Sequence, residues 1–241
     1  MWMICRKEWQ QFFNSLTGYI AVIIFLLLTG LYLFVFPQSN LLDYGYATLA
    51  GFFNLAPWVL LFLVPTVTMR TIADEYRSGT FELLRTLPLS VRQIVWGKFF
   101  GAWLIVIAGL MPTVIYAFSL QALSSEGGID IGSTIGSYLG LILLGGVYTA
   151  VGVCTSSFTS NTVIAFVAGA FICFLLFTGF QAVSALAIFE GGPDYYIEML
   201  GIDFHYRSIS RGVIDSRDLI YFAAFIILFL FITERKTLQY K

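Results

Sequence analysis

The residue types that most often perform catalysis or bind metals are rare in this sequence. The chain of 241 residues contains one histidine and three cysteines. Cys154 and Cys173 lie in long apolar runs and Cys5 lies near the amino terminus, so no disulfide framework is expected and we interpret all three as packing residues. His205 is the single histidine and lies between two apolar runs. One histidine is too few for a His-based metal cluster, and its position outside the runs rules out a Ser/His dyad inside the membrane. We interpret it as an ordinary loop residue and expect no catalytic residue and no metal site.

The sequence also lacks the pattern of a nucleotide-binding loop. The single Gly-Lys pair, Gly97-Lys98, has no glycine at the required upstream position and is followed by Phe99 instead of Ser or Thr. The two longest segments between apolar runs are residues 70–98 and 189–217. Both fall short of the roughly 40 residues below which a domain rarely folds unaided. We therefore expect no bound cofactor in this chain.

The composition is that of an integral membrane protein. Hydrophobic residues make up 59% of the chain, charged residues 11%, and the mean hydropathy is +0.85. The apolar runs are nearly free of polar residues, which favours helices of roughly 20 residues over the alternating pattern of a membrane β-barrel. We predict an all-α fold with six spans in a single domain of residues 1–241, at residues 19–36, 52–69, 99–121, 134–157, 162–188 and 218–233.

The distribution of basic residues predicts the orientation of these spans. With the amino terminus in the cytoplasm, three of the thirteen Lys and Arg residues fall on the outer side, namely Arg207, Arg211 and Arg217. The other ten then fall on the cytoplasmic side, as the positive-inside rule requires, and both termini are predicted to be cytoplasmic. These ten are Arg6, Lys7, Arg70, Arg77, Arg85, Arg92, Lys98, Arg235, Lys236 and Lys241.

The spans carry no ionisable side chain in their interiors, which argues against an ion-driven carrier. If the protein moves a substrate against a gradient, the energy must therefore come from elsewhere. Polar residues within the spans are the candidates for lining a path, and we selected Asn54, Thr149, Thr178 and Gln181. We interpret the pairs Gly97/Gly101 and Gly136/Gly140 as sites of close helix packing.

Residues 70–98 form the most distinctive segment. Gly79 is expected to end one helix, Thr80 to cap a short helix through Leu87, and Pro88 to stop it. Ser90 and Gln93 then match a capping box that opens the helix of the third span.

The short helix of residues 80–87 is amphipathic. Phe81, Leu84 and Leu87 lie on one side, with Glu82 and Arg85 on another. Two interpretations stay open: a docking helix for a cytoplasmic partner and a solvated or headgroup-lying connector.

The amino-terminal segment, residues 1–18, is amphipathic as well. Its apolar side contains aromatic residues and its other side is basic and polar, a pattern typical of a helix lying at the membrane interface. A cytoplasmic extension of the first span is the alternative. The aromatic candidates for the interfacial helix are Trp2, Trp9, Phe12 and Phe13.

The segment from Asp74 to Lys98 resembles the hallmark segment of the ABC-2 type permease family. The elements of the resemblance occur in order: Asp74-Glu75, Arg77-Ser78-Gly79-Thr80, Glu82-Leu83-Leu84, Pro88-Leu89-Ser90 and Ile94-Val95-Trp96-Gly97-Lys98. Family members carry this segment after the second of six spans, as here. Within the family, the chain length and residues 204–218 resemble the permease subunits of gliding-motility-associated ABC transporters.

The resemblance implies a type V exporter-like permease in a bacterial cytoplasmic (inner) membrane, without an ATPase domain of its own. A separate ABC ATP-binding subunit would bind ATP and Mg and dock on the short helix, and a second permease half would complete the transporter. A gliding-type relative would add an auxiliary membrane subunit; the lipid bilayer is the remaining partner, and no nucleic acid is expected. The implied contacts are Glu75, Arg77, Thr80, Phe81, Glu82, Leu84, Arg85, Leu87 and Pro88, with a second contact at Phe158, Thr159 and Ser160.

The outer segment of residues 189–217 is expected to form either a short interfacial or re-entrant helix or a plain loop. For the function as a whole, two alternatives to a permease remain. One is a membrane anchor of a motility or secretion complex without transport, and the other is an intramembrane enzyme.

Overall fold

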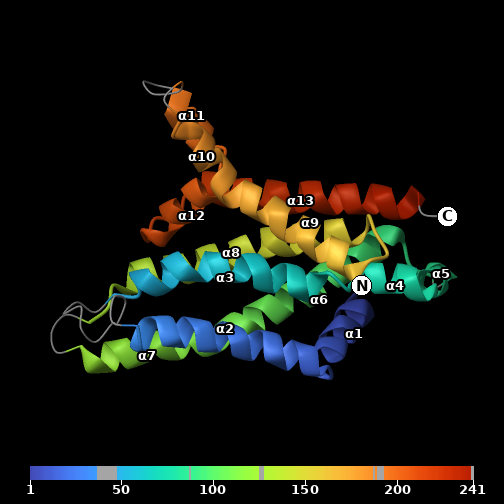
Figure 1. The fold of residues 1–241 in the computed structure, drawn as a ribbon, viewed down its shortest axis with the longest axis horizontal. Helices are drawn as coiled ribbons and strands as arrows, with labels where there is room; N and C mark the ends of the chain where they lie inside the picture. The colour runs from blue at the N-terminus through green and yellow to red at the C-terminus, as the bar shows by residue number, and fades with distance from the viewer. Residues whose placement is uncertain (37–47, 87, 125–127, 187, 189–192, 240–241) are drawn as a thin grey trace.

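A computed structural model describes residues 1–36, 48–86, 88–124, 128–186, 188 and 193–239, and every regular element among them is helical (Figure 1). The first half contains α1 (Trp2–Phe13), α2 (Leu16–Phe34), α3 (Ala50–Thr68), α4 (Ala73–Ser78), α5 (Thr80–Thr86), α6 (Val91–Leu110), η1 (Met111–Thr113) and α7 (Val114–Leu123). The second half contains α8 (Ile131–Ser156), α9 (Thr162–Phe174), η2 (Leu175–Gly179), α10 (Phe180–Ser184), α11 (Pro193–Glu198), α12 (Ile202–Ser210) and α13 (Ser216–Gln239).

The helices confirm the predicted class of multi-pass helical membrane protein. Five continuous helical stretches are long and apolar enough to cross a membrane: Ala50–Ser78, Val91–Leu123, Ile131–Ser156, Thr162–Ser184 and Ser216–Gln239. A sixth candidate is the pair formed by α1 and α2, which meet at a bend of 70°. The sharp bend separates α1 from the apolar helix that follows, as an amphipathic segment ahead of a span requires.

Local capping explains where several helices begin. The Ser15 hydroxyl accepts a hydrogen bond from the Gly18 amide at 3.1 Å and starts α2, and the Asp130 carboxylate accepts from the Ser133 amide at 3.2 Å and starts α8. With Asp130 as its cap, the helix of the fourth span begins at Ile131, three residues before the predicted start at Thr134. The last helix extends beyond its predicted end at Thr233 to Gln239.

Helix α8 is the centre of the bundle and is buried along most of its length. Its glycines allow close approach of neighbours, because a Cβ added at Gly145 would lie 3.0 Å from Val106 and one at Gly146 would lie 3.1 Å from Ile226. The Gly136/Gly140 pair has the same role toward α12, where Tyr206 and the backbone of Ile209 cover it. This confirms its interpretation as a packing site.

The fifth span is interrupted by π-helical geometry. Residues Leu175–Gly179 form one π-helical stretch between α9 and α10, so the helix carries one residue more per turn there than an α-helix. The ring of Trp58 from α3 packs against Phe177 within this stretch, with ring centroids 5.5 Å apart. Beyond it, α10 and α11 project away from the main bundle (Figure 1).

The segment between the fifth and sixth spans is helical where it is described. Residues 189–192 lie outside the described residues, and α11 and α12 follow them. Helix α12 packs on α8 and α13, so the alternative of a plain loop is excluded for residues 193–210.

Candidate functional site

Four sequence-distant parts of the chain meet at one end of the bundle. These are α1, the α4–α5 segment, the turn between α8 and α9, and the carboxy-terminal end of α13 (Figure 1). We call this the basic end, because the described members of the ten-residue basic set gather there. The opposite end contains the end of α7, the start of α8 and α12, and we call it the α12 end.

The local structure of residues 70–98 agrees with the sequence reading. Gly79 has a φ of 69° and separates α4 from α5 in a left-handed conformation that favours glycine. The Ser90 amide donates to the Gln93 side chain at 3.1 Å and the Gln93 amide donates to the Ser90 hydroxyl at 3.3 Å, so the predicted capping box is present. Helix α5 ends at Thr86, and the predicted last residue, Leu87, lies outside the described residues.

A serine from α8 holds the start of this segment. The Ser156 hydroxyl accepts hydrogen bonds from the amides of Ile72 at 3.1 Å and Ala73 at 2.9 Å. It also donates to the Met69 carbonyl oxygen at 3.1 Å. Since Ser156 is fully buried, these bonds satisfy backbone groups that would otherwise be unpaired between α3 and α4.

Apolar contacts hold α5 against the subunit's own helices. The rings of Phe81 and Tyr76 make an edge-to-face contact with centroids 5.0 Å apart, and both side chains belong to a buried cluster with Ile72 and Val153. Leu84 packs against the same cluster and is half-buried. The apolar side of α5 therefore faces inward and fixes the direction in which its other side points.

A buried charge cluster fastens α4 to α1 and α6. The Lys98 ammonium, 1% exposed, lies 2.9 Å from a Glu8 carboxylate oxygen and 2.8 Å from one of Glu75. It also donates to the Thr71 carbonyl oxygen, so its three N–H donors have three acceptors. Lys7, which is half-exposed, adds a second ammonium 3.2 Å from Glu75. Two cations and two carboxylates thus balance in charge.

The proposed ATPase-contact residues divide into inward and outward groups. Glu75 and Phe81 are buried in the contacts just described, and Leu84 is half-buried. The Arg85 side chain and all of Leu87 lie outside the described residues. The exposed members are Arg77, Thr80, Glu82 and Pro88, and Leu83, which the sequence analysis did not select, is 67% exposed beside them.

The second predicted contact lies at the same end of the molecule. Phe158 is 56% exposed, and the Lys236 ammonium from the end of α13 lies 5.3 Å above the centre of its ring. Ser160 is exposed and Thr159 half-buried, while Asn161 caps α9 by accepting from the Val163 amide at 2.9 Å. The last turn of α8 connects this turn to the α4–α5 segment. Ser156, which bonds the amides at the start of α4, and Val153, which belongs to the same buried cluster as Phe81 of α5, both lie just before the turn.

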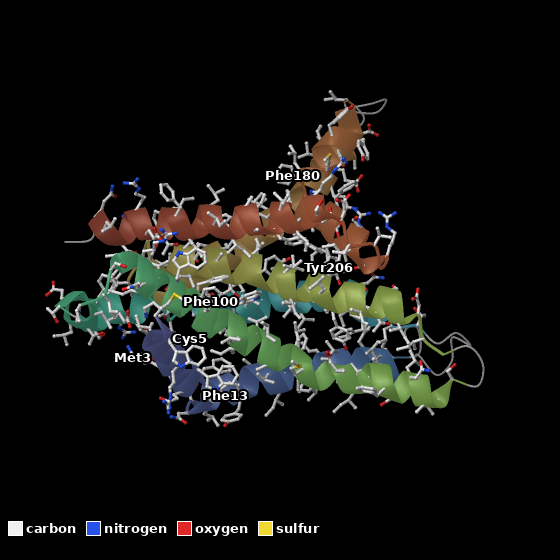
Figure 2. All side chains as sticks on the ribbon, turned by 180° about the vertical axis from the view of Figure 1, so that it is seen from behind. Met3, Cys5, Phe13, Phe100, Phe180 and Tyr206 are labelled. Carbon is white, nitrogen blue, oxygen red and sulfur yellow. The ribbon has the colours of Figure 1, made fainter. Side chains whose placement is uncertain are left out.

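The amino-terminal helix packs on the third span through a side that the aromatic pattern did not identify. Its buried residues are Ile4 and Cys5, and a Cβ added at Gly97 would lie 2.9 Å from the Cβ of Ile4. A Cβ added at Gly101 would lie 2.7 Å from the Cβ of Glu8, which confirms the Gly97/Gly101 pair as a packing site. Of the predicted interfacial residues, Trp2 and Trp9 are exposed and Phe12 and Phe13 are half-buried. Figure 2 shows Cys5 and Phe13 at different places along this helix.

The four candidate path-lining residues are not brought together. Thr149 is fully buried and its hydroxyl donates to the Gly145 carbonyl oxygen of its own helix at 2.7 Å. Thr178 likewise donates to the Phe174 carbonyl oxygen at 2.9 Å, and Gln181 is exposed on α10. Asn54 borders a hollow of about 420 Å³ between α3 and α12 that Arg207 also lines.

The interpretation of His205 as an ordinary loop residue is wrong. It lies on α12 with 4% exposure, its Nδ1 is 2.6 Å from an Asp218 carboxylate oxygen, and its Nε2 is 2.9 Å from the Met199 carbonyl oxygen. Its ring stacks on that of Tyr221 at 3.8 Å. Both ring nitrogens of His205 are therefore within hydrogen-bond distance of an oxygen.

A more exposed charge group lies beside this pair. The Arg207 guanidinium is 2.6 Å from Glu198 and 2.8 Å from Asp203. Burial raises the pKa of the Asp203 carboxyl above its ordinary value, and the guanidinium opposes the rise. These contacts fasten α11 to α12.

A comparison with protein families identifies this arrangement. The model described as ABC-2 family transporter protein matches residues 36–233, which include α3 to α12 and most of α13. A comparison with curated proteins gives no match.

Proposed function

This chain belongs to the ABC-2 family of transporter proteins and is a membrane subunit of a transporter, and we propose that a separate ATP-binding subunit drives it by docking on the basic end. In this proposal ATP and Mg are bound by that subunit, and the chain itself is not an enzyme. In this proposal the basic end faces the cytoplasm of a bacterium, because the basic residues are gathered at that end. Both termini then lie on the cytoplasmic side.

The observation that carries the proposal is the rigid attachment of α5. Phe81 anchors it on Tyr76, Ser156 fixes the start of α4, and the buried Lys98 ties α4 to α1 and α6. A partner can change the state of the spans only if it binds one arrangement better than another, and a helix fastened to them at several points transmits that difference. The exposed surface left for the partner consists of Arg77, Thr80, Glu82, Leu83 and Pro88, with Phe158 and Ser160 nearby.

We further propose that a second membrane half, identical or related, completes the transporter. The finer form of the proposal is a role in gliding motility or secretion, together with an auxiliary membrane subunit. It rests on the resemblance in chain length and in residues 204–218.

The test is purification of this protein with its native partners, followed by ATP hydrolysis assays with and without the subunit. We expect an ATP-binding protein to copurify and its hydrolysis to depend on this chain. Absence of an ATPase leaves the membrane-anchor alternative, and substrate turnover by the purified chain alone supports an enzyme; either result contradicts the proposal.

Two substitutions test the docking surface directly. Glu82→Lys and Leu83→Asp alter exposed side chains of α5, so they are expected to reduce ATPase copurification by about tenfold without lowering thermal stability. Asp130→Asn, at the other end of the bundle, is the control and retains a capping side chain. Unchanged copurification in both α5 variants would place the partner elsewhere.

A further inference from the structure

Two hollows adjoin beside the bend between α1 and α2. The first has a volume of about 390 Å³ and is lined by charged residues of α1, α4 and the end of α3, and we call it the polar chamber. The second has a volume of about 470 Å³ and is lined by apolar residues of α2 and α3, and we call it the apolar chamber. Ala21 and Thr66 line both chambers, so they border each other as one groove. Each volume lies within the range of small-molecule sites.

The polar chamber presents charges of both signs. Lys7 and Arg70 supply cations, and Glu8, Asp74 and Glu75 supply carboxylates. The Glu8 carboxylate is bound to Lys98. Arg70 is exposed and Asp74 half-buried, so both are open to a ligand that enters from the headgroup region.

One carboxylate oxygen of Glu75 in the polar chamber lacks a hydrogen-bond donor within the described part of the chain. Its Oε1 binds Lys98 and Lys7, whereas its Oε2 is buried and has no hydrogen-bond partner among the described residues. The residue as a whole is 8% exposed. A buried carboxylate oxygen without a donor costs free energy, so the chamber favours a ligand that carries an N–H or O–H donor to this atom.

The apolar chamber continues the groove in the direction of the spans. Ile24 and Leu28 of α2 and Phe62 of α3 line it, and each leaves about half of its surface uncovered by this subunit. Trp58 lies at the same hollow. A hydrocarbon chain along these helices would cover apolar side chains at no desolvation cost to any charged group.

We propose that the groove binds one phospholipid with a primary-amine headgroup, of the phosphatidylethanolamine type. Its phosphate meets Lys7 and Arg70, its ammonium donates to Glu75 Oε2 and to Asp74, and one acyl chain follows the apolar chamber. A trimethylammonium headgroup lacks the donor and an anionic glycerol headgroup lacks the cation, so charge complementarity selects the primary amine. The site belongs to this chain alone and does not depend on an ATPase partner.

The position of the groove agrees with a lipid of the bilayer as its occupant. Trp9, Phe13 and Tyr19 form a chain of ring contacts at the α1–α2 bend, with centroids 4.7 Å and 6.1 Å apart. Aromatic residues gather at the headgroup level of membranes. The polar chamber lies at this bend and the apolar chamber extends away from it along α2 and α3, as a headgroup and its acyl chain are arranged.

The experiment is native mass spectrometry of the full chain in detergent, titrated with three lipids of identical acyl chains. The lipids are phosphatidylethanolamine, phosphatidylcholine and phosphatidylglycerol. One phosphatidylethanolamine is expected to bind about tenfold more tightly than either of the others, the effect of one charge-assisted hydrogen bond.

Matched variants locate the site. Arg70→Ala and Asp74→Asn are expected to weaken phosphatidylethanolamine binding by about fivefold to tenfold each. Arg77→Ala and Glu82→Gln remove exposed charges of the same segment that do not line the groove, and they leave the affinity unchanged. Ala21→Trp fills the junction of the chambers and abolishes binding, with thermal unfolding recorded for each variant to confirm that it folds.

Three outcomes overturn the proposal. The first is equal affinity for the three lipids, and the second is unchanged affinity in Arg70→Ala and Asp74→Asn. The third is efficient disulfide formation between two copies of a Phe62→Cys variant in native membranes, because the groove would then be covered by a second copy of this chain.

Discussion

Each end of the bundle contains a buried carboxylate paired with a basic side chain, but the two pairs connect different parts of the chain. At the basic end, Lys98 joins Glu8 and Glu75, and the Lys98–Glu8 contact spans 90 positions of sequence. At the α12 end, His205 joins Asp218, which lies 13 positions away. A pair between distant segments fixes the arrangement of whole helices, whereas a pair between neighbours fixes a local turn. The same kind of interaction therefore has a global role at one end and a local role at the other.

The largest expected effect comes from removing the cation at the basic end. Lys98→Met leaves Glu8 and Glu75 facing each other without a cation between them, so we expect a loss of about 3–5 kcal/mol of stability. Thermal unfolding of the purified protein in detergent measures it. Lys7→Met is the control, because Lys7 is half-exposed and its loss costs about 1 kcal/mol or less.

A second substitution separates charge imbalance from lost packing. Adding Glu75→Gln to Lys98→Met removes one of the two carboxylates that Lys98 pairs with in the parent protein and should recover part of the stability. No recovery would mean that the cost of Lys98→Met arises from packing.

The next largest effect is expected at the α12 end. His205→Phe preserves the ring stacking on Tyr221 but leaves the Asp218 carboxylate buried without its partner, at a cost of about 3 kcal/mol. Hydrogen exchange should accelerate in α11 and α12 and stay unchanged in α4 and α5. Faster exchange at both ends would contradict the division into local and global pairs. Asp218→Asn retains a hydrogen-bond acceptor and should have a smaller effect.

A packing substitution sharpens the comparison at the basic end. Gly101→Ala brings a methyl group 2.7 Å from the Cβ of Glu8 and should displace α1 from α6, at a cost of about 1–2 kcal/mol. Gly109→Ala, in the same helix, meets its nearest neighbour at 4.0 Å and should be neutral or stabilising by up to about 1 kcal/mol. Equal unfolding midpoints for the two variants would argue against close packing at Gly101.

The smallest effect concerns the half-exposed group beside α12. Because the folded-state pKa of Asp203 is raised, its contribution to stability is present at acidic pH and is lost as the pH rises through that pKa. Asp203→Asn should therefore be about 1 kcal/mol or less more stable than the parent at pH 7, with no gain at pH 3 to 4. Unfolding midpoints of Asp203→Asn and of the parent at both pH values test the direction of this pH dependence. A larger gain in stability at the acidic pH would refute it.

The fold was predictable from sequence because long apolar runs and local caps are local signals. The capping box at Ser90, the break at Gly79 and the close packing at Gly97 and Gly136 could all be read from neighbouring residues. The bend between α1 and α2 follows from the change from an amphipathic to an apolar pattern. The direction in which α1 faces was not readable, since its aromatic side points away from α6 and its packing side is centred on Ile4 and Cys5.

The buried charges were the part that sequence could not reveal. Lys98 was assigned to the cytoplasmic basic set and to the family-like segment, but not to a buried charge cluster. Its partners Glu8 and Glu75 lie far from it in sequence, and nothing local distinguishes a buried lysine from an exposed one. His205 was considered a loop residue for the same reason, although Asp218 lies near enough for a charge pair to be suspected. Glu75 likewise points inward because it pairs with Lys98. The sequence alone could not show that Glu75 is absent from the exposed docking surface.

The π-helical stretch Leu175–Gly179 has a consequence for the angular relation of the two parts of the fifth span. A π-helical turn accommodates one residue more than an α-helical turn. Deleting one residue there would replace the wide turn by a regular α-helical turn, so α9 and α10 would keep nearly the same angle about the helix axis. Gln181 would therefore keep nearly the same direction. The extra residue thus widens the helix beside Trp58 and Phe177 without changing the direction in which the outer segment leaves the bundle.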